Sequence, residues 1–122
     1  MRQWNFHHLG IPTDEVKEGE SYNPKYKFYS IHFEANPYRI QWLRFPKEST
    51  LPKIITHIPH LAFKVEDLDA EIEGKKVILD PWEPLDGFRV AIIEDEGAPI
   101  EFIETTISDE ELARLDEEAD YA

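Results

Sequence analysis

Two short stretches of this chain match each other, and they decide the fold that the sequence predicts. The first is Phe6-His7-His8-Leu9-Gly10-Ile11, and the second, 52 residues later, is Ile58-Pro59-His60-Leu61-Ala62-Phe63. Each contains a histidine, a leucine, a small residue and a bulky apolar residue in the same order. Such a match within one chain indicates an internal repeat.

A second matching pair lies further along each half of the chain. Arg39-Ile40-Gln41-Trp42-Leu43 corresponds to Pro99-Ile100-Glu101-Phe102-Ile103, with a polar residue between apolar ones and an offset of 60 residues. We therefore predict one domain built from two similar modules. Module one covers about residues 1–50, module two about 51–107, and an acidic C-terminal helix about 108–120.

Hydrophobic periodicity predicts an α+β fold with a similar order of elements in both halves. The strands expected in the first half lie at about 5–13, 26–34 and 38–45, and those in the second half at about 57–65, 76–83, 88–95 and 99–105. Asp67 is the expected N-cap of a helix that stops at Gly74, and Ser108 with Glu111 forms the capping box of the last helix. In the first half only residues 14–20 remain for a helix, and 46–52 are expected to be a linker.

Composition excludes several classes of function. The 122 residues carry 13 Lys and Arg against 26 Asp and Glu, a net charge of -13, which disfavours binding to nucleic acid. The longest aliphatic run, residues 90–93, is too short to span a membrane, and no signal peptide is recognisable, so we expect a soluble, cytoplasmic protein. With no cysteine, a metal must be held by histidine, carboxylate or amide groups.

Strand parity predicts which side chains share a face of the sheet, because successive side chains in a strand point to opposite sides. Leu9, Ile11, Leu61, Phe63 and Val65 are expected to face a layer of helices. Gly10 and Ala62 should leave room on the other face for a ligand. The polar residues that fall on that face are His8, Gln41, His60 and Glu101. Two imidazoles, an amide oxygen and a carboxylate suit a divalent cation such as Zn, Ni, Co, Mn or Fe.

Other polar and aromatic residues have simpler expected roles. A lone histidine in a strand is most often hydrogen-bonded or at the surface, and we expect this of His7, His32 and His57. Glu104 is expected in solvent. The eight aromatic residues between positions 22 and 45 are expected in the core or in a dimer interface.

The motifs resemble the vicinal oxygen chelate superfamily, which includes glyoxalase I, methylmalonyl-CoA epimerase, extradiol dioxygenases and bleomycin-resistance proteins. The resemblance covers residues 6–104. It implies two βαβββ modules that form a curved, mainly antiparallel sheet, with metal ligands on the first and last strand of each module. His8 and His60 match the first-strand ligands, and Gln41 and Glu101 match the last-strand ligands. Gln41 stands where many members of the superfamily place glutamate.

Three classes of function follow. The first is a metal-dependent lyase, isomerase or epimerase, in which the metal activates a small oxygenated substrate and Glu101 is the catalytic base. The second is a metal-free protein of the bleomycin-resistance type that sequesters a small molecule. The third is a non-haem iron dioxygenase that uses His8, His60 and Glu101. For each class we expect a homodimer, because the aromatic residues of the first half exceed what its own core needs.

Overall fold

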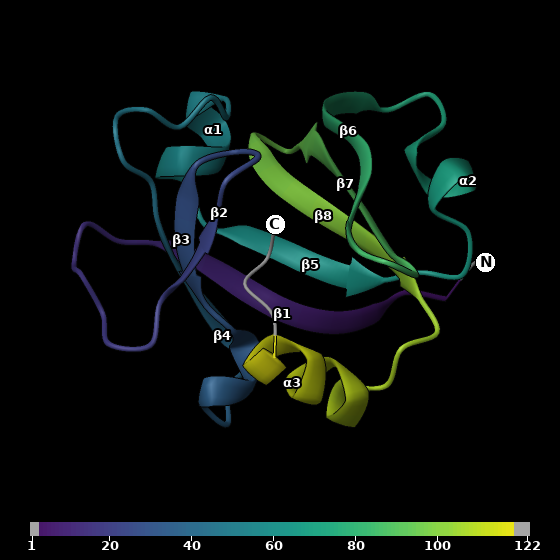
Figure 1. Cartoon of the computed structure of the whole chain (residues 1–122). Helices are drawn as coiled ribbons and strands as arrows, with labels where there is room; N and C mark the ends of the chain where they lie inside the picture. The colour runs from purple at the N-terminus through teal and green to yellow at the C-terminus, as the bar shows by residue number, and fades with distance from the viewer. Residues whose placement is uncertain (1–2, 119–122) are drawn as a thin grey trace.

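The computed structural model describes residues 3–118, and its eight strands form one curved sheet (Figure 1). The strands run across the sheet in the order β2-β3-β4-β1-β5-β8-β7-β6. None of the helices within residues 3–118 is long and apolar enough to cross a bilayer.

Module one contributes half of the sheet. Its elements are β1 (Asn5–Pro12), β2 (Ser21–Asn23), β3 (Phe28–Ile31), the short 3-10 helix η1 (Phe33–Ala35) and β4 (Ile40–Arg44). The three predicted strands are present, and each is shorter than predicted, β1 by one residue. The three-residue strand β2 was not predicted, because it is too short to show alternation.

Module two contributes the other half and two helices. Its elements are α1 (Lys53–His57), β5 (His60–Lys64), α2 (Leu68–Ile72), β6 (Lys76–Leu85), β7 (Phe88–Asp95) and β8 (Ala98–Thr105), followed by the C-terminal helix α3 (Asp109–Glu118). The sequence did not predict α1. The predicted helices α2 and α3 and all four predicted strands are present, although β5 begins three residues later than predicted. Residues 119 and 120, the predicted end of α3, lie outside the described residues.

The sheet has the same plan on both sides of its centre. β1 and β5 pair antiparallel in the middle, and each pairs in parallel with the last strand of its own module, β4 or β8. The remaining pairs are antiparallel. The predicted fold class, a curved and mainly antiparallel α+β sheet with a C-terminal helix, is confirmed. The first and last strands of both modules therefore lie side by side at the centre.

Helix α2 packs on the outer face of module two. Asp67 Oδ1 accepts a hydrogen bond from the Ala70 N–H at 3.2 Å, as an N-cap does, and Glu104 Oε1 accepts one from the Leu68 N–H at 2.9 Å. Glu104 was expected in solvent; its side chain is 37% exposed, and it also helps to cap this helix. The core beneath α2 consists of Val65, Leu68, Ala91, Ile93 and Phe102.

Within residues 3–50 no helix corresponds to α2, so among the described residues module two alone has the full βαβββ order. Residues 13–20, where a helix had room, form a loop between β1 and β2. With no helix over this part of the outer face, Leu61 is 41% exposed and Phe6 50% exposed. Leu61 was predicted to lie in the core. It is on the predicted face of the sheet, but the described residues cover it only in part.

Candidate functional site

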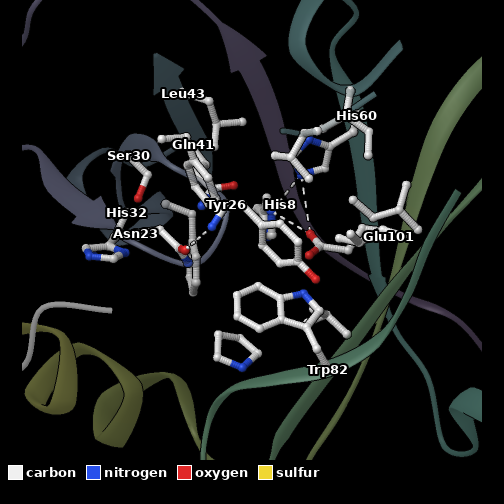
Figure 2. Close-up of a pocket in the computed structure, with 18 of the residues that line it drawn as sticks. His8, Asn23, Tyr26, Ser30, His32, Gln41, Leu43, His60, Trp82 and Glu101 are labelled. Atoms are coloured by element: carbon white, nitrogen blue, oxygen red, sulfur yellow. Dashed lines mark hydrogen bonds and ion pairs between the residues drawn. The ribbon is translucent and has the colours of Figure 1, made fainter. Parts of the chain in front are cut away.

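Three potential metal ligands come from three neighbouring strands at the centre of the sheet. His8 lies on β1, His60 on β5 and Glu101 on β8. In the strand register, His8 pairs with Ala62, and Ala62 also pairs with Glu101. The small side chain at Ala62 thus lies between two of the potential ligands, and all three point from the same face of the sheet into one cavity (Figure 2).

The three potential metal-ligating atoms form a nearly equilateral triangle. His8 Nε2 lies 3.2 Å from His60 Nε2 and 3.2 Å from Glu101 Oε1, and His60 Nε2 lies 3.3 Å from the same oxygen. Ligand atoms held about 2.1 Å from a metal lie roughly 3.0 to 3.4 Å apart in octahedral or tetrahedral geometry. The observed spacing fits three ligands on one face of a divalent cation.

The protonation states also suit a metal. His8 is 5% exposed, and this burial lowers the pKa of its imidazole, which stays neutral at neutral pH. Burial alone would raise the pKa of Glu101, but hydrogen bonds with His60 and His8 outweigh it and hold that pKa well below its usual range. A neutral imidazole and an ionised carboxylate are the forms that bind metal.

Gly10 makes room for one of these side chains. It lies opposite His60 in the β1–β5 pair, and a Cβ atom on Gly10 would come within 2.0 Å of His60 Cε1. The sequence predicted that Gly10 leaves space for a ligand. The structure shows that the imidazole of His60 occupies this space, so glycine is required to position a potential metal ligand.

His7 joins His8 on the cavity face because β1 contains a bulge. Phe6 pairs with Phe63 and His8 with Ala62, so His7 is an extra residue on β1. Simple alternation along β1 would place His7 on the outer face and Phe6 on the same face as His8. In the structure His7 is only 4% exposed and lines the cavity, while Phe6 lies on the outer side against Phe63. The histidine doublet was the only sequence signal for this arrangement.

The bulge brings the two imidazoles into direct contact. His7 Nδ1 lies 2.8 Å from His8 Nδ1, so one nitrogen donates a hydrogen bond and the other accepts it. Burial lowers the pKa of His7 to about 4, which keeps this imidazole neutral at neutral pH. Without a metal, the hydrogen bond from His8 Nε2–H to Glu101 makes His7 the donor of this pair. In the other tautomer His8 Nδ1–H is the donor, and its Nε2 carries the lone pair that a metal needs. His7 can therefore hold His8 in the tautomer that binds metal.

Gln41 lies at the position in module one that Glu101 occupies in module two. It pairs with Gly10 as Glu101 pairs with Ala62, and it lines the same cavity. No hydrogen bond or ion pair joins Gln41 to His8, His60 or Glu101 within the described part of the chain. Its role as a fourth ligand stays a prediction.

The rest of the cavity, about 110 Å³ in volume, is mainly aromatic and aliphatic. The aromatic side chains in its wall are Tyr26, Phe28, Phe33, Phe45, Trp82 and Phe88. Four of these come from the stretch that was expected in the core or in a dimer interface. Phe33 is a buried core residue as expected, whereas Tyr26, Phe28 and Phe45 are half-buried in the cavity wall. Helix α1 adds Ile55 and helix α3 adds Leu112.

The two remaining histidines differ from each other. His32 lines the cavity, and its Nε2 lies 3.4 Å from the hydroxyl oxygen of Ser21. His57 is exposed on α1 and contacts the backbone oxygen of Lys53 at 3.1 Å. His57 is therefore the surface residue that was expected, and it offers a control position outside the cavity.

Comparison with known proteins supports the fold. Neither a family model nor a curated protein sequence matches this chain. A hypothetical protein from Bacillus halodurans C-125 superposes with a TM-score of 0.64 at 19% identity, over 88% of this chain and 98% of that one. Methylmalonyl-CoA epimerase from Mycobacterium tuberculosis superposes with a TM-score of 0.56 at 18% identity, over 89% and 91%. The chain has the glyoxalase-like fold of this epimerase.

Proposed function

We propose that this chain is a metal-dependent epimerase or isomerase of the glyoxalase-like class, acting on a small oxygenated substrate. The observation that carries the proposal is the triangle of His8, His60 and Glu101 donor atoms, with sides of 3.2, 3.2 and 3.3 Å, at the wall of an apolar cavity. The fold shared with methylmalonyl-CoA epimerase supports the reaction class.

His8, His60 and Glu101, with Gln41 as the predicted fourth ligand, would hold a divalent cation such as Zn, Ni, Co, Mn or Fe. When bound, such a cation acts as a Lewis acid on a substrate oxygen and makes the adjacent carbon more acidic. The apolar walls exclude water and so strengthen the electrostatic interactions inside the cavity.

Glu101 is the proposed catalytic base. Its Oε1 faces both imidazoles, which leaves Oε2 to take a proton from the carbon beside the substrate carbonyl. The C–H bond breaks, its electron pair moves toward the carbonyl oxygen, and the proton later returns to carbon. The sequence of steps needs no oxidant or reductant, as an isomerisation or epimerisation requires.

Exchange of a substrate proton with deuterium tests this proposal with two model compounds in place of the natural substrate. Methylmalonyl-CoA and 2-hydroxyacetophenone are each incubated in D₂O with metal-loaded protein, and at least one of them should lose the signal of the proton on the carbon beside the carbonyl. Glu101→Gln and His8→Ala should abolish the exchange, and the control His57→Ala should retain it. Exchange that persists in Glu101→Gln, or that is absent with both compounds, would count against an epimerase or isomerase.

A second candidate, a non-haem iron dioxygenase, is favoured by one observation. The ligand cluster consists of two histidines and one carboxylate, the set that such enzymes use to hold Fe(II) with open coordination positions. Oxygen uptake by Fe(II)-loaded protein in the presence of catechol would support this candidate. Protein that contains no metal after purification without an affinity tag, and takes up none, would instead support metal-free sequestration of a small molecule.

A further inference from the structure

Trp82 carries a buried hydrogen-bond donor that no group within residues 3–118 satisfies. Its Nε1 atom is buried and has no hydrogen-bond partner among these described residues. A buried indole N–H normally has a partner, and leaving such a donor unpaired destabilises the fold. Trp82 lines the same cavity as the ligand cluster. The unpaired donor therefore indicates an acceptor atom on a bound molecule.

The indole has a defined place in the cavity. In Figure 2 the Trp82 nitrogen lies on the edge of the ring that is turned toward the side of His8 and Glu101. The phenol ring of Tyr26 packs edge-on against the indole, with 4.8 Å between ring centroids. Trp82 also packs against the buried cluster of Ala62, Val90 and Ile103. These contacts fix the ring, so the donor is held ready for a ligand.

The charged residues around the cavity limit the charge that a bound ligand can have. Among the described residues, its lining contains no lysine or arginine, and Glu101 is its single carboxylate. Two cationic side chains stack on aromatic rings of the wall. Arg39 stacks on Phe33 and is already paired with Asp109 at 2.9 Å. The Lys25 ammonium lies 5.0 Å from the centroid of the Trp82 ring. With a net charge of -13, the protein also repels anions at long range. A phosphate group would be poorly held here.

The shape and chemistry of the wall favour a ring. Six aromatic side chains surround the cavity, and flat rings gain both burial and edge or stacking contacts from such a wall. We propose that the ligand is a small, uncharged, ring-bearing molecule with at least two oxygens, one at the His8–His60–Glu101 cluster and one accepting the Trp82 N–H. This inference deepens the proposed function and rests on it for the oxygen at the cluster.

Three compounds that share a hydroxymethyl ketone group test whether the cavity prefers a ring and disfavours a charged group. They are hydroxyacetone, 2-hydroxyacetophenone and dihydroxyacetone phosphate, titrated calorimetrically into metal-loaded protein. The phenyl compound should bind at least tenfold more tightly than the other two, because burying a ring contributes more than one factor of ten in affinity. Equal or tighter binding of the phosphate compound would overturn the proposal.

Trp82→Phe tests the donor, since it keeps an aromatic ring and removes only the N–H. It should weaken binding of 2-hydroxyacetophenone about tenfold, while Trp4→Phe, on the outer face and 46% exposed in the wild type, should have no effect. In ¹H–¹⁵N spectra the Trp82 indole signal, assigned from this variant, should move downfield on adding the compound. Unchanged affinity and an unmoved signal would mean that only water pairs with this donor, and would overturn the proposal.

The same titration on chelator-treated protein separates the two proposals. Tight binding of the phenyl compound without metal, together with no deuterium exchange in metal-loaded protein, would keep the ring-binding cavity and reject the epimerase or isomerase. Metal binding and proton exchange on methylmalonyl-CoA, without any preference for the ring, would keep the proposed function and reject the inferred ligand class.

Discussion

Gly10 and His60 lie opposite each other so closely that a Cβ on Gly10 would be 2.0 Å from His60 Cε1. Gly10→Ala should therefore displace the imidazole and lower metal affinity at least tenfold, as measured by competition with a chromophoric chelator. The clash should also destabilise the fold by about 1 to 3 kcal/mol. In the double variant with His60→Ala, the ring is gone and the stability lost through Gly10→Ala should return. If Gly10→Ala lowers the stability by the same amount with and without the His60 imidazole, the two residues are not coupled.

Substitution of Gln41 tests whether the metal has three or four protein ligands. A glutamate here keeps the side-chain length and adds a negative charge, so Gln41→Glu should raise affinity for Zn or Ni at least tenfold, about 1.4 kcal/mol. Glu101→Gln should lower it and abolish proton transfer. Competition against a chelator measures both changes. If Gln41→Glu leaves the affinity unchanged while His8→Ala and His60→Ala reduce it, the site has three ligands and the dioxygenase becomes the better candidate.

His7 should make the metal-free protein sensitive to acid. Its pKa is lowered to about 4 in the folded state from 6.5, so the unfolded chain binds more protons between these values. The free energy of unfolding should have its full value above pH 6.5 and should fall by about 3 kcal/mol as the pH decreases to about 4. The comparison is urea unfolding of wild type and His7→Gln across this range. A constant difference between the two at all pH values would contradict the prediction.

The ion pair between Glu20 and Arg44 gives a second test of pH dependence. Arg44 holds Glu20 through two hydrogen bonds of 2.9 and 2.8 Å, and these lower the pKa of Glu20. The stabilisation should be present above the ordinary glutamate pKa, about 4.3, and should be lost as the pH falls through the lower folded-state pKa. Glu20→Gln should therefore destabilise the protein at pH 7 and have little effect near pH 2. An equal effect at both values, measured by urea unfolding, would show that the charge does not matter.

We still propose a homodimer, but the proposal now depends on an exposed apolar patch on the outer face of the sheet. Four of the aromatics that suggested it line the cavity instead, but Trp4, Phe6 and Leu61 are 46%, 50% and 41% exposed on the outer face around β1 and β5. A second copy that covers this patch would bury them. Light scattering at micromolar concentration should give twice the chain mass of 14.3 kDa, and Phe6→Asp should reduce it to one chain. A wild-type mass of one chain throughout that range would reject the dimer.

The repeat, the α+β class and the face of the sheet that carries His8, Gln41, His60 and Glu101 could all be predicted from the sequence alone. These features depend on local rules, because alternation in a strand fixes the side of each residue and the repeat identifies equivalent strands. Pairing of the central strands then places the four side chains in one cavity.

The features that depend on contacts between strands could not be predicted and are known from the folded structure. The bulge that brings His7 beside His8 exists only in the pairing of β1 with β5, and the need for glycine at position 10 exists only because His60 lies opposite. The aromatic wall, including the unpaired donor of Trp82, combines segments from both modules. Alternation in a single strand carries no information about the neighbour across it, which is why these parts of the site could not be predicted.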